Sequence, residues 1–202
     1  MDRVPAPVRR RRKKLGRAKT GAEGGAQQRG GGANGGNGGA ILVGHAAGAW
    51  VAILVALRRP DLVRGIVGIG SDPDFTEDLL WPSLSESDQE AIMTGNCGEE
   101  GGGEGILNVP WGKRGEEYPI TRSLIVDGRE NLVLRGGKDS LDVNCPVRLV
   151  HDLDDPEVPP MTSMRLAEAV RSDDVVLVMP KGGIKGIEEA VEECFEAAAK
   201  KG

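Results

Sequence analysis

Residues 40–60 decide the fold, and they read AILVGHAAGAWVAILVALRRP. The short apolar run at 41–43 stops at Gly44, which is typical of a buried strand followed by a sharp turn. The Ala-rich stretch 46–57 comes next and ends on two arginines and a proline, which are helix stop signals. Residues 62–70 are again largely apolar and predict a second strand. Strand, turn, helix and strand in this order predict a βαβ unit with parallel strands.

The C-terminal part of the chain repeats this alternation of strand and helix. Short apolar runs predict strands, and longer amphipathic stretches predict helices. The predicted elements are a strand at 146–151, a helix at 162–171 with Thr162 as its N-cap, a strand at 175–179 and a helix at 187–201. Together with the βαβ unit they predict a parallel α/β sheet of about four strands with flanking helices.

An insertion of about residues 72–144 interrupts the alternation. It mixes Pro, Gly and charged residues, and it predicts amphipathic helices near 85–93 and 121–134. Ser85 is a candidate N-cap of the first of these helices. The Gly- and Glu-rich stretch 98–105 has low complexity and predicts a loop. The insertion is therefore predicted to be mostly helical.

The first 39 residues differ in composition from the rest of the chain. They contain eleven glycines and almost no large apolar side chain, so they predict a disordered tail in front of a folded domain at 40–202. Ten basic and two acidic residues fall within the first 40, whereas the rest of the chain holds 16 basic and 29 acidic residues. Three roles stay open for the tail: a solvated segment, a transit-like segment, or a nuclear or nucleic-acid patch. No aromatic residue lies among the basic ones, so specific nucleic-acid binding is not expected.

Composition and spacing disfavour several other classes of protein. No uninterrupted apolar run reaches the ~18 residues of a membrane-spanning helix, so no transmembrane segment is expected. The three cysteines are odd in number and lack metal-ligand spacing, which indicates free thiols in a reducing compartment. His151 stands beside Asp152 and Asp154, but one histidine with neighbouring aspartates is a weak zinc pattern. We therefore expect neither a metal nor a cofactor.

Four segments resemble one branch of the α/β hydrolases. The stretch GHAAG at 44–48 fits the frame of the G-x-S-x-G nucleophile elbow, with Ala46 at the serine position. The stretch HDLDDPEVP at 151–159 resembles the H-G-x-x-D-x-x-V-P segment that carries the triad acid. Residues 73–81 and 118–129 resemble the cap of the mitochondrial palmitoyl-protein thioesterases, also known as mycophenolic acid acyl-glucuronide esterases, and of their bacterial relatives.

This resemblance implies a truncated α/β-hydrolase core with a helical cap and a family activity of acyl-ester or thioester hydrolysis, including depalmitoylation. It implies no cofactor, and its partners would be an acylated protein or a small acyl ester. It places the chain in the mitochondrion, with the cytoplasm as the alternative because the basic tail is a poor transit peptide. The first four strands of the full fold have no counterpart in this sequence. We therefore expect an open sheet edge at 41–43 through which the chain self-associates.

Most of the catalytic residues that the resemblance implies are replaced. Ala46 offers no side-chain oxygen at the nucleophile position, and Ile184 stands at the position of the catalytic histidine. Asp155 matches the triad acid, and the backbone N–H of Ala47 matches one oxyanion donor. The second donor comes from a loop in the part of the fold without a counterpart here. A serine hydrolase needs all of these groups together, so we expect the chain to be catalytically defective.

Three hypotheses stay open from the sequence. The chain is a defective homologue of a serine thioesterase, a non-catalytic acyl-binding or regulatory pseudoenzyme, or an incomplete gene model of an active thioesterase. Ser71 follows the second strand and is an alternative nucleophile if it is exposed. Cys145 is expected in the core or at its rim, and His45 is expected to pack at the elbow.

Overall fold

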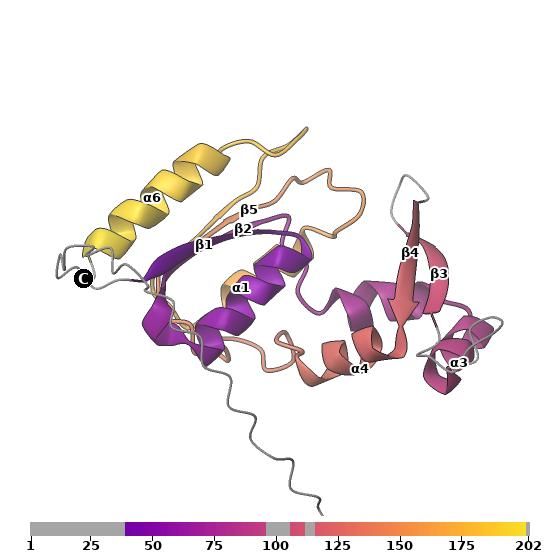
Figure 1. Ribbon diagram of the computed structural model, residues 1–202. Coiled ribbons are helices and arrows are strands. Elements are labelled where there is room, and N and C mark those ends of the chain that lie inside the picture. The colour runs from indigo at the N-terminus through magenta and orange to yellow at the C-terminus, as the bar shows by residue number, and fades with distance from the viewer. Residues whose placement is uncertain (1–38, 96–105, 112–115, 201–202) are drawn as a thin grey trace, which may run out of the picture. The chain divides into compact units, whose positions relative to one another are not determined.

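Four parallel strands form the central sheet, in the order β1-β2-β5-β6 (Figure 1). They are β1 (Ala40–His45), β2 (Val63–Ile69), β5 (Val147–Val150) and β6 (Val175–Val178). The prediction of a parallel α/β sheet of about four strands is confirmed. Because the strands are parallel, their carboxyl ends meet at one edge of the sheet, which is where open α/β sheets bind ligands.

The computed structural model describes residues 39–95, 106–111 and 116–200. All of them belong to one unit, Gly35–Gly202. The expected tail, except for Gly39, and the expected loop at 98–105 lie outside the described residues.

Helices cover both faces of the sheet. Helices α1 (Ala47–Arg58) and α5 (Met161–Ala169) contribute to one hydrophobic cluster, and α6 (Ile187–Lys200) packs into a second one. Figure 1 shows α1 and α6 on opposite sides of the strands. For the two inner strands, β2 and β5, this arrangement buries both faces, which explains why they read as largely apolar runs.

Strand β2 shows this two-sided burial most clearly. Ile66 packs into the cluster of α1 and α5, whereas Val67 packs into that of α6, and both are fully buried. Burying a side chain of this size stabilises a fold by about 1.5–3 kcal/mol. At Gly65 a Cβ atom would lie 2.5 Å from the Sγ of Cys194, so glycine makes room for that thiol. Burial raises the pKa of Cys194, which makes it a core residue rather than a reactive one.

The segment between β2 and β5 contains a β-hairpin that the sequence analysis did not predict. Strands β3 (Ile106–Trp111) and β4 (Glu116–Thr121) pair antiparallel. The expectation of a mostly helical insertion is therefore wrong for this part. Both strands contain a proline, which hides the strand pattern in the sequence and is tolerated in a ribbon of two edge strands.

Helical elements make up the rest of this segment. They are the π-helical turn η2 (Thr76–Leu80), α2 (Trp81–Ser83), α3 (Glu86–Thr94) and α4 (Arg122–Glu130), and the short 3-10 turn η1 (Pro60–Leu62) precedes β2. Helix α4 is shorter than the predicted 121–134. The Thr121 hydroxyl accepts the backbone N–H of Leu124 at 3.1 Å, so it caps the helix that begins after β4.

The two predicted helix caps had different outcomes. Ser85 caps α3, because its hydroxyl accepts the backbone N–H of Asp88 at 3.2 Å. Thr162 does not cap α5, and that prediction is wrong. The helix begins at Met161 after Pro160, so Thr162 already lies inside the first turn. Pro160 already has helical backbone angles, φ −55° and ψ −24°, so the helical turn starts ahead of Thr162.

A third hydrophobic cluster lies within the inserted segment. Its buried members come from η2, the loop after α2, α3, β4 and α4: Leu80, Leu84, Ile92, Ile120 and Ile125. The Phe75 ring contacts the Trp50 ring edge-on at 5.9 Å between centroids, which links the inserted segment to α1. The bounds of a cap at about 72–144 stay a prediction.

Candidate functional site

Ala46 adopts a strained backbone conformation between β1 and α1. Its φ is 48° and its ψ is −120°, a combination that residues other than glycine seldom adopt. Such strain costs on the order of 1–3 kcal/mol and persists only where the surroundings enforce it. Here the Ala46 N–H donates to the carbonyl oxygen of Ile69 at 2.9 Å, which fastens the turn to the neighbouring strand. The geometry is that of a sharp strand-to-helix elbow, with a methyl group at its tip.

The two glycines of the elbow play different parts. A Cβ atom on Gly44 would lie 2.4 Å from the carbonyl carbon and oxygen of Gly48, so strand and helix approach too closely there for any other residue. A Cβ atom on Gly48 would meet nothing within 4 Å. Only Gly44 is therefore required for the close passage of β1 and α1.

Ala47 opens helix α1 directly after the elbow. The first N–H groups of a helix have no intrahelical acceptor, and the helix dipole adds partial positive charge at this end. The position suits the N–H of Ala47 for the oxyanion role that the resemblance implies. That role stays a prediction.

Asp155 lies at the carboxyl edge of the sheet with its carboxylate held in place. One oxygen, Oδ1, accepts the backbone N–H groups of Glu157 at 2.8 Å and Val158 at 3.0 Å. A Cβ atom on Gly70 would lie 3.6 Å from Asp155 Oδ2 and 3.9 Å from His45 Nε2. The structure thus brings the Asp155 carboxylate and the His45 ring to the same point beside Gly70, at the end of β2.

The loop that carries Ile184 is fastened to the loop that carries Asp155. The Asp152 carboxylate accepts the backbone N–H groups of Gly182 at 3.2 Å and Gly183 at 2.8 Å. Ile184 follows directly and its side chain is partly exposed. The positions that the resemblance assigns to the acid and to the base therefore lie on adjoining loops. What is missing at the second of them is an ionisable side chain.

His151 serves the structure of this edge rather than acting as a free base. It is fully buried, its Nδ1 lies 2.6 Å from the Ser163 hydroxyl, and its Nε2 lies 3.1 Å from the carbonyl oxygen of Val158 and 3.6 Å from Asp155 Oδ2. Both ring nitrogens are thus engaged inside the protein. Within the described ranges, no group of three or more His, Cys, Asp or Glu side chains is placed to hold a metal ion.

The burial of Ser71 and Cys145 decides between the roles that the sequence left open for these two residues. Ser71 is fully buried, and a Cβ atom on Gly68 would come within 2.4 Å of its hydroxyl oxygen. The expectation that Ser71 could be an exposed nucleophile is therefore wrong, because the hydroxyl points into the packed end of β2. Cys145 is half-buried and packs against the cluster of α1 and α5, as expected of a rim residue.

A pocket of about 350 Å³ opens next to the elbow. It is lined by Asp72, Pro73, Asp78, Leu79, Arg135, Pro159, Met161, Thr162 and Arg165. Asp72 joins it to the elbow, since its backbone N–H donates to the carbonyl oxygen of Ala46 at 3.3 Å. Burial and the neighbouring carboxylates Asp155, Asp78 and Asp74 raise the pKa of Asp72 to about 7. Asp72 is not among the site residues expected from the sequence, although the run of acidic residues from 72 to 78 is a visible signal.

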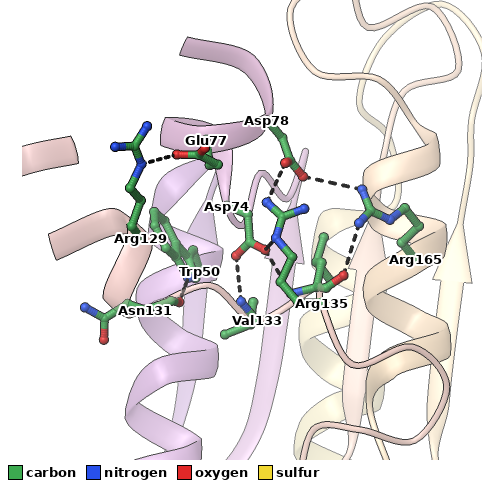
Figure 2. Close-up of polar contacts among 10 residues, drawn as sticks. Trp50, Asp74, Glu77, Asp78, Arg129, Asn131, Val133, Arg135 and Arg165 are labelled. Atoms are coloured by element: carbon green, nitrogen blue, oxygen red, sulfur yellow. Dashed lines mark hydrogen bonds and ion pairs between the residues drawn. The ribbon is translucent and has the colours of Figure 1, made fainter. Parts of the chain in front are cut away.

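Arginines balance the other acidic residues of this region (Figure 2). Asp74 is fully buried, and Arg135 Nε lies 3.6 Å from its carboxylate. Asp78 pairs with Arg135 and, at 3.5 Å, with Arg165. Arg165 also donates to the carbonyl oxygen of Leu134 at 3.1 Å. The pocket wall made by Asp78 and the two arginines is therefore already charge-compensated.

The sequence resembles curated thioesterases over most of its length. It is 30% identical over 143 residues to human mitochondrial palmitoyl-protein thioesterase ABHD10, which covers 70% of this chain and 42% of the human protein. It is 28% identical over 152 residues to mouse ABHD10, covering 75% of this chain and 47% of the mouse protein. The chain thus spans less than half the length of these relatives. No family model matches it.

Solved structures share the same architecture. The mouse α/β hydrolase domain-containing protein 10 superposes with a TM-score of 0.60 at 25% identity, over 84% of this chain and 65% of that one. A protein from Agrobacterium vitis S4 superposes with a TM-score of 0.59 at 28% identity, over 79% of this chain and 59% of that one. No helix among the described residues is both long and apolar enough to cross a membrane.

Proposed function

This chain has the α/β-hydrolase fold, and we propose that it is a thioesterase homologue that has lost the ability to hydrolyse its ester or thioester substrate. One observation carries the proposal. The strained elbow position, which in a serine hydrolase presents the nucleophile, is occupied by Ala46 at φ 48° and ψ −120°. A methyl group there has no lone pair with which to attack an acyl carbon.

The base position supports the same reading. Ile184 stands on the loop that Asp152 fastens beside Asp155, and an isoleucine cannot take a proton from a nucleophile. His151 cannot stand in for it, because both of its ring nitrogens are engaged in the buried interior. Triad members act as a unit, so the loss of two of them removes most of their joint contribution.

The test uses a fluorophosphonate probe and p-nitrophenyl and palmitoyl-thioester substrates. We expect no covalent labelling and no turnover above background for the wild-type chain. Ala46→Ser alone is expected to stay unlabelled, since a serine hydroxyl without a base is a weak nucleophile. Ala46→Ser with Ile184→His is expected to label at most weakly, because the second oxyanion donor that the resemblance implies has no counterpart in this sequence. Human ABHD10 serves as the active control.

Wild-type turnover that a covalent serine inhibitor blocks would contradict the proposal. Probe labelling mapped by peptide mass spectrometry then identifies the residue responsible. Labelling at an unexpected serine would show that a nucleophile other than position 46 is in use. Labelling that disappears after a further purification step would instead point to a contaminating hydrolase.

The substrate class and the compartment are proposed from the same relatives. Acylated proteins or small acyl esters are the ligands to try first, since the similar human and mouse proteins are named palmitoyl-protein thioesterases. A mitochondrial location is proposed because those proteins are also named mitochondrial. Fractionation of cells that express a tagged full chain tests the location, and a cytosolic signal would contradict it.

A further inference from the structure

The pocket beside the elbow contains one buried carboxyl group without a counter-charge. Asp72 is only 7% exposed and lines the pocket. Its side chain makes no hydrogen bond or ion pair within the part of the chain that the structure describes. A buried charge of this kind is costly unless a partner neutralises it. We propose that the pocket binds a small organic cation, an alkylammonium group whose charge pairs with the Asp72 carboxylate.

The charges around Asp72 favour a cation at this place. Its acidic neighbours are Asp155 from the loop after β5, Asp78 from η2 and Asp74 from its own loop. Burial, and after it these three carboxylates, raise the pKa of Asp72 to about 7, and no positively charged residue is among the causes. An ammonium group beside the carboxylate would lower the pKa of Asp72 again, because an opposite charge at contact distance favours the ionised form.

The two arginines of the pocket do not make it an anion site. Arg135 contacts Asp74 and Asp78, and Arg165 contacts Asp78 and the carbonyl oxygen of Leu134. Their charges are thus already compensated by Asp74 and Asp78. An anion placed here would gain little from them and would be repelled by the ionised Asp72.

The rest of the lining suits the alkyl part of such a ligand. Pro73, Leu79, Pro159 and Met161 supply apolar surface next to Asp72. A volume of about 350 Å³ is within the range of small-molecule pockets. The inference goes beyond the proposed loss of hydrolysis and does not depend on it, since none of these residues is at a triad position.

The first experiment is calorimetric titration of the full chain with n-hexylammonium chloride at pH 8 and pH 6. Hexylammonium keeps its charge at both pH values. Asp72, with a pKa of about 7, is about one-tenth ionised at pH 6 and about nine-tenths ionised at pH 8. We expect about tenfold tighter binding at pH 8. Sodium hexanoate and 1-hexanol, which have the same chain length without the positive charge, are expected to bind at least tenfold more weakly at pH 8.

Variants separate the Asp72 carboxylate from the general negative charge of the domain. Asp72→Asn is expected to weaken hexylammonium binding at least tenfold at pH 8 and to abolish its dependence on pH. Asp61→Asn is the matched control, because Asp61 is an exposed aspartate paired with Arg59 outside the pocket. It is expected to leave binding unchanged. Thermal unfolding of both variants verifies that each is folded.

A second measurement needs no variant. The carboxyl carbon of Asp72 is followed by NMR as a function of pH, with and without hexylammonium, and its titration midpoint is expected to fall when the ligand is present. An unchanged midpoint, or no detectable binding at millimolar hexylammonium at pH 8, would overturn the inference. So would hexanoate binding as tightly as hexylammonium, which would make the pocket a carboxylate site centred on Arg135 and Arg165.

Discussion

The carboxylate of Asp74 accepts a hydrogen bond from the backbone N–H of Val133 at 2.7 Å, which joins two segments that lie 59 residues apart in the chain (Figure 2). Its second oxygen accepts the N–H of Leu134 at 2.9 Å. Asp74 is fully buried and holds a positive φ of 63°, a conformation that Asp and Asn tolerate better than most residues. One side chain thus joins the two ends of the inserted segment.

Asp74→Ala is expected to lower the free energy of unfolding by about 3 kcal/mol. The reason is that two buried N–H groups and Arg135 lose their acceptor at once. Asp74→Asn should be milder, since asparagine keeps one acceptor oxygen and tolerates the positive φ. Urea denaturation monitored by circular dichroism measures both, with exposed Asp61→Ala as the control. A loss below about 0.5 kcal/mol for Asp74→Ala would show that water satisfies these groups.

Gly44→Ala and Gly48→Ala are expected to have different effects on the free energy of unfolding. The first forces a methyl group to within 2.4 Å of the Gly48 carbonyl and should cost at least about 3 kcal/mol or prevent folding. The second places a methyl group in open space within a helix and should be neutral or stabilise the chain by about 0.5–1 kcal/mol. Thermal unfolding of the two variants side by side measures the difference. Equal effects would mean that the elbow relaxes around either residue.

The contribution of Asp72 to the free energy of unfolding is expected to fall as the pH rises from about 4 to 7. Its pKa is about 7 in the folded protein and near 3.8 in the unfolded chain, so the folded state holds a proton that the unfolded state has released. Above pH 7 the buried charge must be tolerated. Asp72→Asn should therefore be about 1–2 kcal/mol more stable than wild type at pH 8 and no more stable near pH 4.

Denaturation midpoints at pH 4, 6 and 8 check this prediction. The difference between wild type and Asp72→Asn should grow with pH. A constant difference would mean that Asp72 stays in one protonation state throughout. Asp61→Asn again provides the comparison, because its partner Arg59 is on the surface.

Strand β1 is expected to mediate self-association. It pairs with β2 on one side, and no strand among the described residues pairs with the other. Val43 on this strand is 54% exposed, and the strand carries neither lysine nor proline to discourage pairing. Sedimentation velocity should show dimers or larger species that grow with concentration. Val43→Lys should shift the distribution toward monomer, whereas Leu62→Lys, an exposed position outside the strand, should not.

A wild-type chain that stays monomeric at every concentration tested would contradict the role of β1. An equal effect of both lysine variants would instead assign the association to surface hydrophobicity in general. Either outcome can be read from the same set of sedimentation runs.

The burial of Asp72 could not be predicted from its place in the sequence. Its three acidic neighbours come from its own loop, from η2 and from the loop that holds Asp155, more than 80 positions further along the chain. The burial of Ser71 was equally hidden in the sequence. A serine that follows a strand suggests exposure, but Ser71 packs against Gly68 in the structure. The hairpin of β3 and β4 was missed because prolines interrupt its apolar alternation and only pairing reveals the strands.

The sequence by itself determined the parallel α/β architecture, because the periodicity of apolar residues dictates which segments form strands and which form helices. It also determined that position 46 lacks a nucleophile and position 184 lacks a base, since a side chain's functional groups do not depend on the fold. Only the tertiary structure decided that Gly44 is required and Gly48 is not, and that Asp72 is buried with no counter-charge among the residues the structure describes. Close contact and electrostatic potential arise between groups far apart in the chain, and folding alone brings those groups together.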